Sequence, residues 1–297
     1  MHDTDGTSIE GPAEYAERSF RNWQAAAAGW DAQRAYVAES MRGITEWLLA
    51  AVDPRPGESM LELAAGPGQL AAELAPRLQP GGRLLCTDRS PNMVEAARRA
   101  AREAGLAGVD HRVADALALE LPDASQDAVV CRMGYMLMAD HERAFAETRR
   151  VLRPDGRVGF VVWAAAEQNP WATTLFGALE DGGWQPPATP GGPGMFSLAE
   201  PGRRSAILRG AGLRVVRDEL IPIVWQYPSF DAFWDIQGSL SGGVARLRDE
   251  LPEADLERLL DAVRTAIEPF RQGAEYRLHG LAAGVLARPE PGPGGTR

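Results

Sequence analysis

The chain has no lysine, only two cysteines and only four histidines among its 297 residues. All 31 basic residues are arginines, and 41 acidic residues leave a net charge of −10. An acidic chain without a clustered basic face lacks the electrostatic footprint of nucleic-acid binding, so we expect no nucleic-acid partner. Two cysteines are too few for a disulfide framework or a metal cluster. We therefore expect no metal, and we expect Cys86 and Cys131, which lie in apolar runs, to be buried free thiols.

Long hydrophobic runs are also missing. No apolar stretch approaches the ~18 residues that cross a bilayer. The first residues are polar and acidic, without the basic and then apolar order of a secretory signal. We expect a cytoplasmic protein that does not associate with membranes, and a homodimer is possible.

Short apolar runs do alternate with helical stretches, and this alternation predicts an α/β fold. We expect a Rossmann-like, seven-stranded, mostly parallel sheet with helices on both faces. An N-terminal helical lid covers about residues 13–52, and a helical insertion lies near the C-terminus at about 229–273. The expected strands are residues 59–64, 83–88, 109–114, 127–132, 157–163, 213–219 and 281–287.

A glycine loop follows the first of these strands. Gly66 and Gly68 let the backbone approach a ligand closely, and the next helix begins just behind them with free amide groups. Asp88 ends the next strand, where a carboxylate can accept both hydroxyls of a ribose. These features also fit the loose dinucleotide pattern, so a nicotinamide-dependent oxidoreductase stays open.

Two further acids favour a different ligand. Glu62 lies at the end of the first strand, where it would oppose a pyrophosphate but suit a ligand that carries a sulfonium and an ammonium group. Asp115 closes the third strand and is placed to receive an adenine amino group.

At this point the sequence resembles the class I S-adenosylmethionine-dependent methyltransferases. It is similar to the branch of ubiquinone/menaquinone C-methyltransferase-like and other small-molecule methyltransferases. The matching stretches are LELAAGPG, TDRSPNM, ADAL and RVLRPDGR, which occur in that order within residues 58–163. One departure is Ala65-Gly66-Pro67, where relatives often carry Cys-Gly-Thr. The backbone makes the contacts there, so we expect the change to be tolerated.

The resemblance implies a cofactor, S-adenosylmethionine, and a set of residues around it. The methionine part would be surrounded by the following residues: Glu62, Ala64, Gly66, Gly68, Arg132 and Met133. The ribose and adenine would be held by the following residues: Asp88, Arg89, Ser90, Met93, Asp115 and Ala116. Among these, Asp88 would take the ribose hydroxyls, Asp115 the adenine amino group, and the Ala116 amide a ring nitrogen.

The same resemblance divides the chain into four parts. Residues 1–52 would form an N-terminal helical lid, and residues 53–163 the S-adenosylmethionine-binding core. Residues 164–287 would complete the core and add substrate-binding insertions, because the likeness weakens beyond residue 164. Residues 288–297, rich in proline and glycine, would be a flexible tail.

Methyl transfer is an in-line displacement, and positioning in a dry site supplies much of its catalysis. A general base is needed only where the acceptor must lose a proton. The weak candidates are Tyr135, just past the fourth strand, His141 at a helix start, and His279 before the last strand. A tyrosine in this place more often forms part of a pocket wall than acts as a base. A histidine such as His141 more often caps the helix or lies at the surface. His111, within the third strand, is expected to face away from the cofactor. No base is assigned.

Aromatic residues crowd the chain after the fifth strand, and methionines follow the fourth. As a group they predict a largely apolar substrate chamber. The commoner role of any one of them is core packing between an insertion and the sheet. The residues are Trp163, Trp171, Phe176, Trp184, Phe196, Trp225, Tyr227, Phe230, Phe233 and Trp234, with Met133, Met136 and Met138. Trp23 and Trp30, seven residues apart, would lie on one face of a lid helix.

Our main hypothesis is methyl transfer to a small-molecule acceptor, an aromatic or polyketide-like natural product, with S-adenosylhomocysteine as product. The acceptor atom is left unassigned. The alternative is a methyltransferase-fold protein that uses bound S-adenosylmethionine for cyclisation or rearrangement. Formation of S-adenosylhomocysteine separates the two.

Overall fold

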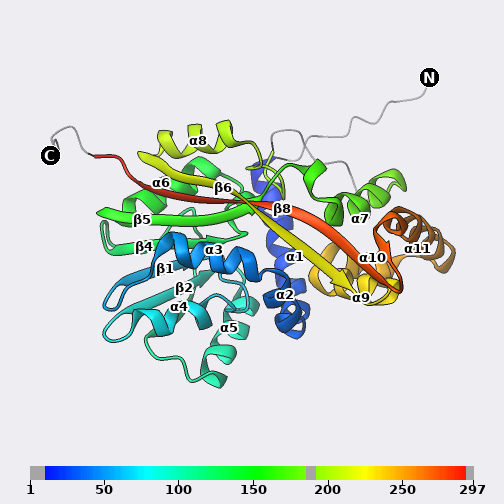
Figure 1. The fold of residues 1–297 in the computed structure, drawn as a ribbon, viewed down its shortest axis with the longest axis horizontal. Helices are drawn as coiled ribbons and strands as arrows, with labels where there is room; N and C mark the ends of the chain where they lie inside the picture. Colours follow the sequence, from blue (N-terminus) through cyan, green and yellow to red (C-terminus); the bar gives the residue numbers. More distant parts are fainter. Residues whose placement is uncertain (1–10, 185–191, 292–297) are drawn as a thin grey trace.

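The computed structural model describes residues 11–184 and 192–291, which are built around a single sheet (Figure 1). The strands run in the order β3-β2-β1-β4-β5-β8-β6, and the two-residue β7 (Arg271–Gln272) pairs with β8. The first five strands are parallel, and β8 and β6 are antiparallel to them. The parallel strands are β1 (Ser59–Leu63), β2 (Arg83–Asp88), β3 (Val109–Val113), β4 (Gln126–Arg132) and β5 (Leu152–Trp163). The mostly parallel α/β fold predicted from the sequence is confirmed.

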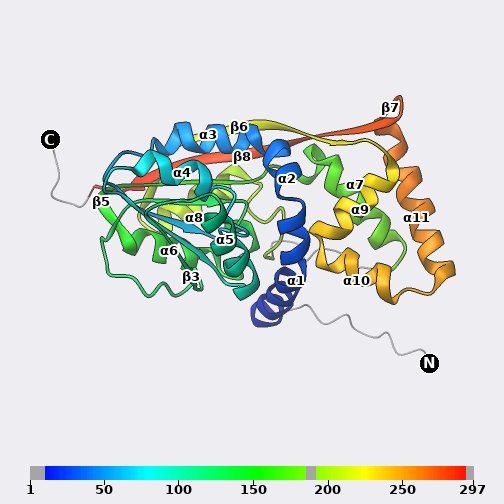
Figure 2. The ribbon, with the colours of Figure 1, turned by 90° about the horizontal axis from the view of Figure 1, so that it is seen from below.

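Helices cover both faces of this sheet, as the edge-on view of Figure 2 shows. The central strands are therefore buried on both sides, which explains why β4 and β5 are continuous apolar runs rather than alternating ones. Ala128, Val129, Val130 and Cys131 of β4 are fully buried. The helices next to the parallel strands in the chain are α3 (Arg42–Val52), α4 (Ala71–Leu78), α5 (Pro91–Glu103) and α6 (His141–Val151), and α8 (Pro201–Gly210) precedes β6.

The last two long strands differ from our prediction. β6 (Leu213–Tyr227) and β8 (Glu275–Pro289) are each 15 residues long and pair along their whole length. β8 pairs with β5 only through residues 282–287, so half of this ribbon extends beyond the sheet. The predicted strands 213–219 and 281–287 were therefore too short. Buried Ile221, Ile223, Trp225 and Tyr227 alternate with less buried residues, which is the pattern of a strand with one covered face.

The projecting half of the ribbon carries a group of helices, visible beside it in Figure 1. The group comprises α7 (Pro170–Asp181), α9 (Phe230–Leu240), α10 (Gly242–Glu250) and α11 (Glu253–Ile267). The segment predicted to be helical near the C-terminus is thus three separate helices, and α7 was not predicted. β8 runs to Pro289, two residues into the expected tail, whose residues 292–297 lie outside the described part, as do residues 185–191.

The N-terminal segment is helical as expected, in α1 (Pro12–Ala32), α2 (Arg34–Ser40) and α3. α1 lies between the sheet and the helical group (Figure 2) and contacts α5 on one side and α9 and α10 on the other. The contact with α9 is close, because a Cβ added at Gly29 would lie 1.9 Å from the carbonyl oxygen of Ser239. The indole of Trp30 donates to the carbonyl of Leu240 over 2.9 Å. α1 therefore joins the two parts of the molecule.

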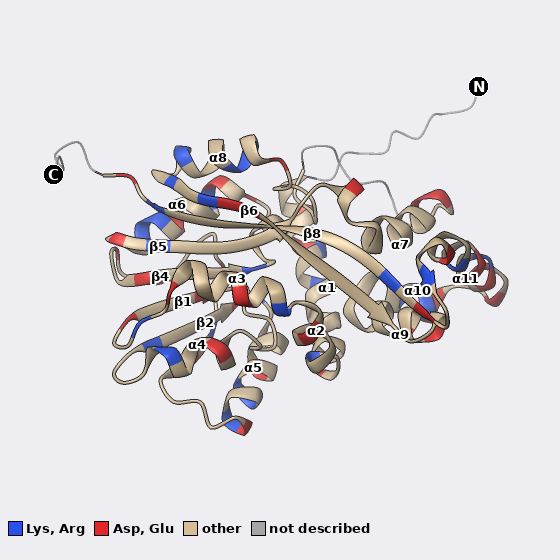
Figure 3. Ribbon diagram, viewed as in Figure 1, with Lys and Arg blue, Asp and Glu red and all other residues tan. Residues whose placement is uncertain are grey.

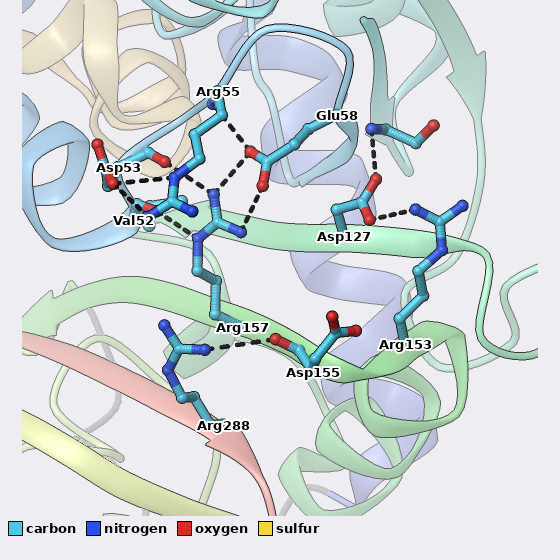
Figure 4. Close-up of polar contacts among 10 residues, drawn as sticks. Val52, Asp53, Arg55, Glu58, Asp127, Arg153, Asp155, Arg157 and Arg288 are labelled. Atoms are coloured by element: carbon cyan, nitrogen blue, oxygen red, sulfur yellow. Dashed lines mark hydrogen bonds and ion pairs between the residues drawn. The ribbon is translucent and has the colours of Figure 1, made fainter.

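An arginine network closes the amino-terminal edge of the sheet, opposite the glycine loop (Figure 4). Arg157 of β5, only 8% exposed, donates to both carboxylate oxygens of Glu58 over 2.8 and 2.7 Å. The same guanidinium donates to the carbonyls of Val52 and Asp53, where α3 ends. A buried charge satisfied in this way fixes the loop before β1 to α3.

The distribution of surface charges and the state of the two cysteines agree with what the composition predicted. In the view of Figure 3, arginines are interspersed with acidic residues rather than gathered on one basic face. Cys86 and Cys131 are buried free thiols, as predicted. Within residues 11–184 and 192–291, no helix is both long and apolar enough to span a membrane.

Candidate cofactor and acceptor site

A cavity lies at the carboxyl ends of β1, β2 and β4, beneath α1. Strand order reverses between β1 and β4, and ligands of open α/β sheets bind at such a switch point. The cavity encloses about 1240 Å³ of space between atoms, including solvent at its mouth. It is lined by the glycine loop, the segments that follow β2, β3 and β4, and one face of α1.

The glycine loop bends sharply at this edge. Ala64 and Gly66 have φ of 50° and 55°, and Met133, just past β4, has φ of 63°. Left-handed backbone at a non-glycine residue is strained, and such residues cluster at functional sites. Gly134 packs directly against the loop. A Cβ at this position would lie only 2.5 Å from the Cβ of Ala64, so a glycine, which has no Cβ, fits there. The ends of β1 and β4 are therefore closely packed under the cavity.

Gly68 differs from the expectation that it surrounds a ligand. It does not line the cavity formed by the described residues. Its φ is 82°, and an added Cβ would lie 3.0 Å from the Cβ of Ala97 in α5. We correct its role to helix packing, which is the usual task of a later glycine in such loops.

Asp88 lies in the cavity between the glycine loop and the start of α5. One carboxylate oxygen accepts from the Gly66 amide over 2.9 Å, and the other accepts from the Ser90 amide over 2.8 Å. Each oxygen keeps a free lone pair for a hydroxyl donor. Burial raises the pKa of Asp88, although these backbone bonds oppose the rise.

Glu62 is the most buried acid of the cavity, with 2% of its surface exposed. The thiol of Cys86 donates to it over 3.2 Å. Burial raises the pKa of Glu62 to about 7, and the neighbouring Arg132 opposes this rise. The carboxylate therefore lacks a full complement of partners, and a cationic ligand group would stabilise its charge.

Arg132 at the end of β4 lines the cavity and is held by two neutral side chains. It donates to the hydroxyl of Thr45 over 3.0 Å and to the amide oxygen of Gln69 over 2.7 Å. The sequence did not single out Thr45 or Gln69, because they lie on separate segments, far from Arg132 in the chain.

Asp115 and Arg89 lie together where the cavity meets the segments after β2 and β3. Asp115 accepts from the Leu117 amide over 2.9 Å, and its other oxygen lies 3.7 Å from the guanidinium of Arg89. Arg89 also donates to the carbonyl of Ala16 in α1 over 2.9 Å and lies 5.3 Å from the ring centroid of Phe20. Arg89 thus connects this acid to the lid helix.

The predicted lid tryptophans are in place. Trp23 and Trp30 line the cavity, and their ring centroids are 5.7 Å apart. Sequence analysis did not identify the other α1 residues that line the cavity, because their spacing does not distinguish them from other residues of the helix. The remaining cavity residues on this side are Ala16, Ser19, Phe20, Met41, Leu137, Met138 and Ala139.

Gln24 fastens α1 to the start of α5. Its amide oxygen accepts from the hydroxyl of Ser90 and from the amide of Asn92, the latter over 3.1 Å. Ser90 caps α5 by accepting from the Met93 amide over 3.2 Å. Met93, Ala114 and Ala116 complete this part of the cavity.

The three weak candidates for a base all lie outside the cavity lined by the described residues. Tyr135 is fully buried, 4.2 Å from the ring centroid of Phe145, and its hydroxyl lies 2.6 Å from that of Thr148. His141 is buried rather than at the surface and lies 3.1 Å from the hydroxyl of Ser197. His279 is exposed on β8. We therefore withdraw all three as bases.

The aromatic residues after β5 also lie elsewhere. None of the ten lines the described cavity. Several of them pack the ribbon against its helical group, as in the pairs Trp163–Trp171 and Trp171–Trp225, with ring centroids 4.6 and 5.5 Å apart. Their commoner role as core is thus the correct one. Of the three methionines, Met133 and Met138 line the cavity, whereas the sulfur of Met136 is buried and accepts from the backbone amide of Trp163 over 3.5 Å. His111 lies outside the cavity, as expected.

Fold and site together define a Rossmann-like protein that binds a nucleoside-containing ligand. A methyltransferase domain model matches residues 61–160. Nocamycin O-methyltransferase of Saccharothrix syringae is 31% identical over 226 residues, which are 73% of this chain and 80% of that protein. The chain belongs to the class I S-adenosylmethionine-dependent methyltransferases, and S-adenosylmethionine is its cofactor. The family and cofactor predicted from the sequence are confirmed.

Other relatives match over shorter stretches. Demethylmenaquinone methyltransferase of Thermus thermophilus is 42% identical over 115 residues, 38% of this chain, and the match spans about half (51%) of that protein. Among solved structures, the [4+2]-cyclase SpnF aligns with a TM-score of 0.53 at 21% identity, covering 84% of this chain and 80% of that one. This likeness shows a shared fold.

Proposed function

We propose that this enzyme transfers the methyl group of S-adenosylmethionine to a small, largely apolar acceptor, such as an aromatic or polyketide-like natural product. One observation carries the proposal: the cavity has two chemically different halves. Its carboxylates lie at the ends of β1 to β3, whereas Trp23 and Trp30 of α1 and Met138 after β4 add an aromatic and apolar lining. An apolar, aromatic lining fits a flat or greasy ligand.

The nucleoside part of the cofactor is assigned to the polar half. Asp88 would accept the ribose hydroxyls with its two free lone pairs, and Asp115 would accept from the adenine amino group. Met93 would pack on the base, and the Ala116 amide would meet a ring nitrogen. Arg89 and Ser90 would border the nucleoside.

The methionine part is assigned to the glycine loop. Glu62, whose charge lacks partners, would face the ammonium and sulfonium groups, and the backbone of Ala64 and Gly66 would surround them. Arg132 and Met133 would border the same part. The raised pKa of Glu62 supports this fit, because a cation nearby would favour its ionised form.

The bound cofactor supplies an activated methyl group. The protein's task is to hold an acceptor in line with it and to keep water away. Trp23 and Trp30 on α1 would cover the acceptor, and Leu137 and Met138 would support it from below. Glu62, Asp88 and Asp115 are the only carboxylates among the described lining residues, and all three are assigned to the cofactor. The acceptor would therefore need no protein base, or would reach the site already ionised.

Calorimetry and product analysis test the proposal. S-adenosylhomocysteine should bind and NAD should not. Asp88→Ala should abolish binding, while the exposed Asp110→Ala on β3, which does not line the cavity, should leave binding unchanged. Incubation with S-adenosylmethionine and a panel of aromatic and polyketide acceptors should release S-adenosylhomocysteine and a methylated product. Cofactor binding without turnover of any acceptor would count against the proposal.

A non-methylating reaction is the second candidate. The fold shared with a [4+2]-cyclase and the lack of a base on the acceptor side are both compatible with it. Conversion of an acceptor to an isomer without S-adenosylhomocysteine would identify that outcome.

The domain division stays a proposal: residues 1–52 as lid, 53–163 as cofactor core, 164–287 as the remainder with its insertions, and 288–297 as tail. The homodimer and the cytoplasmic location also stay predictions.

A further inference from the structure

We propose that Ser19 and Trp23 of α1 donate hydrogen bonds to an oxygen atom of the acceptor, so that the acceptor is a flat ring system with a carbonyl, enolate or phenolate oxygen. The inference rests on the proposed function, because it deepens the assignment of the α1 side of the cavity to the acceptor. It makes Ser19 and Trp23 the residues that determine acceptor specificity.

Almost every polar side chain that lines the cavity already has a partner in the described chain. The carboxylates, both arginines and the side chains of Gln69, Thr87, Ser90 and Trp30 each take part in a hydrogen bond.

The exceptions are the hydroxyl of Ser19 and the indole N–H of Trp23. Neither has a hydrogen-bond partner within residues 11–184 and 192–291. Neither group is enclosed by protein, in contrast to the buried indole N–H of Trp225, which also lacks a partner. Both groups are therefore available to a ligand.

The helix α1 places these two donors next to each other. Ser19 and Trp23 lie four residues apart, so their Cβ atoms are about 5–6 Å apart on one face of the helix. The helix is fastened at both sides of this face, because Gln24 accepts from the Asn92 amide and the indole of Trp30 donates to α9. Both donors are thus held in position before an acceptor binds.

The two free groups define the chemistry of their partner. An indole N–H only donates, and a hydroxyl can donate as well, so an oxygen with two lone pairs matches both. The part of α1 that lines the cavity has no charged side chain, so this recognition is by neutral donors. Hydrogen bonds to an oxygen also favour its ionised form, which suits an acceptor that reaches the site as an enolate or a phenolate.

The rings beside these donors favour a flat acceptor. The ring centroids of Trp23 and Trp30 are 5.7 Å apart at an interplanar angle of 58°, and both rings line the cavity. Aromatic faces and edges of this kind pack well against another ring. A saturated hydrocarbon chain would take the donors of Ser19 and Trp23 out of water without pairing them, which costs affinity. The geometry therefore favours an oxygenated ring over a hydrocarbon.

The test compares two probes that differ by one oxygen. Fluorenone and fluorene are flat tricyclic molecules of nearly the same shape, and only fluorenone has a carbonyl group. Equilibrium dialysis with saturating S-adenosylhomocysteine measures the affinity of each probe, and the ratio of fluorenone to fluorene affinity isolates the contribution of the carbonyl. We expect wild type to bind fluorenone roughly tenfold more tightly than fluorene.

Two variants each remove one donor and keep most of the surface. Ser19→Ala and Trp23→Phe should each lower the affinity ratio roughly three- to tenfold, which is the loss of one hydrogen bond between neutral groups. Ser19→Thr keeps the hydroxyl and should keep the ratio within about twofold. The matched controls outside the cavity are Ser205→Ala on α8 and Trp47→Phe on α3, which should leave the ratio unchanged.

The affinity of every variant for S-adenosylhomocysteine shows whether it has folded and keeps this test separate from the proposed function. An unchanged ratio in both Ser19→Ala and Trp23→Phe would overturn the inference, even if both probes bound more weakly. A lower ratio in only one variant would remove the other residue from the proposal. Wild type that prefers fluorene, or that binds S-adenosylhomocysteine but neither probe, would overturn it as well. If wild type does not bind S-adenosylhomocysteine, the proposed function itself fails.

Discussion

The protonation of Glu62 should control both the stability of the free protein and its affinity for the cofactor. Burial raises its pKa from the ordinary 4.5 to about 7 in the folded chain. A raised pKa means that the folded state holds the proton more tightly than the unfolded state does. Stability linked to this group is therefore complete below pH 4.5, declines as the pH rises toward 7, and is lost above it.

The size of this effect follows from the same two values. A rise in pKa from 4.5 to about 7 corresponds to about 3 kcal/mol of unfolding free energy. Glu62→Gln stays neutral at every pH, so it should become more stable relative to wild type across this window. Urea unfolding at pH 5 and pH 8 measures the difference. Glu73→Gln, on the exposed face of α4, is the matched control and should show no such trend.

The free protein favours the protonated form of Glu62, whereas the cofactor-bound protein should favour the ionised form, because cationic groups stabilise a carboxylate. Wild-type affinity for S-adenosylhomocysteine should rise by up to about tenfold per pH unit toward pH 7 and then level off. Binding at pH 6 should release about one proton, which calorimetry in buffers of different ionisation heat detects. In Glu62→Gln both the slope and the proton release should disappear. The same slope in wild type and variant would refute the reasoning.

Three further predictions concern residues whose roles the structure defines. Arg157→Met leaves the half-buried Glu58 without its partner and should lower the unfolding free energy by about 3 kcal/mol in a denaturation assay, with S-adenosylhomocysteine affinity unchanged. Gly68→Ala places a Cβ against Ala97 at a positive φ and should cost about 1 kcal/mol or more by the same assay; unchanged stability with lost affinity would instead restore Gly68 as a ligand contact. Tyr135→Phe should keep kcat within about twofold and cost about 1 kcal/mol of stability, and a large fall in kcat would return it to the catalytic machinery.

The cofactor half of the site could be read from the sequence because its signals are local. A strand, a glycine loop and a helix follow each other within residues 59–78, and acids lie at the ends of the next two strands. In parallel strands these ends must meet at one edge, so Glu62, Asp88 and Asp115 come together without knowledge of the side chains. Gly68 was misassigned because packing and ligand contact both require glycine there.

The acceptor half depends on contacts that no local pattern encodes. Tyr135 follows β4 closely, but the left-handed backbone at Met133 turns the chain, and the ring packs beside Phe145 and Phe160 instead. The aromatic residues after β5 predicted a hydrophobic cluster. Composition alone cannot say whether such a cluster surrounds a ligand or fills the core between a ribbon and its helices.

The aromatic-rich C-terminal region still influences the acceptor site, through α1. This helix lines the cavity with Trp23 and Trp30, and Gln24 fastens it to the start of α5. Its far side rests on α9, where the indole of Trp30 donates to the carbonyl of Leu240 and Gly29 permits close contact. The ribbon and its helices therefore set the position of a wall that they do not form themselves. The same helix also accepts from Arg89 through the carbonyl of Ala16, and Arg89 lies 3.7 Å from Asp115, so α1 contacts both ends of the cavity.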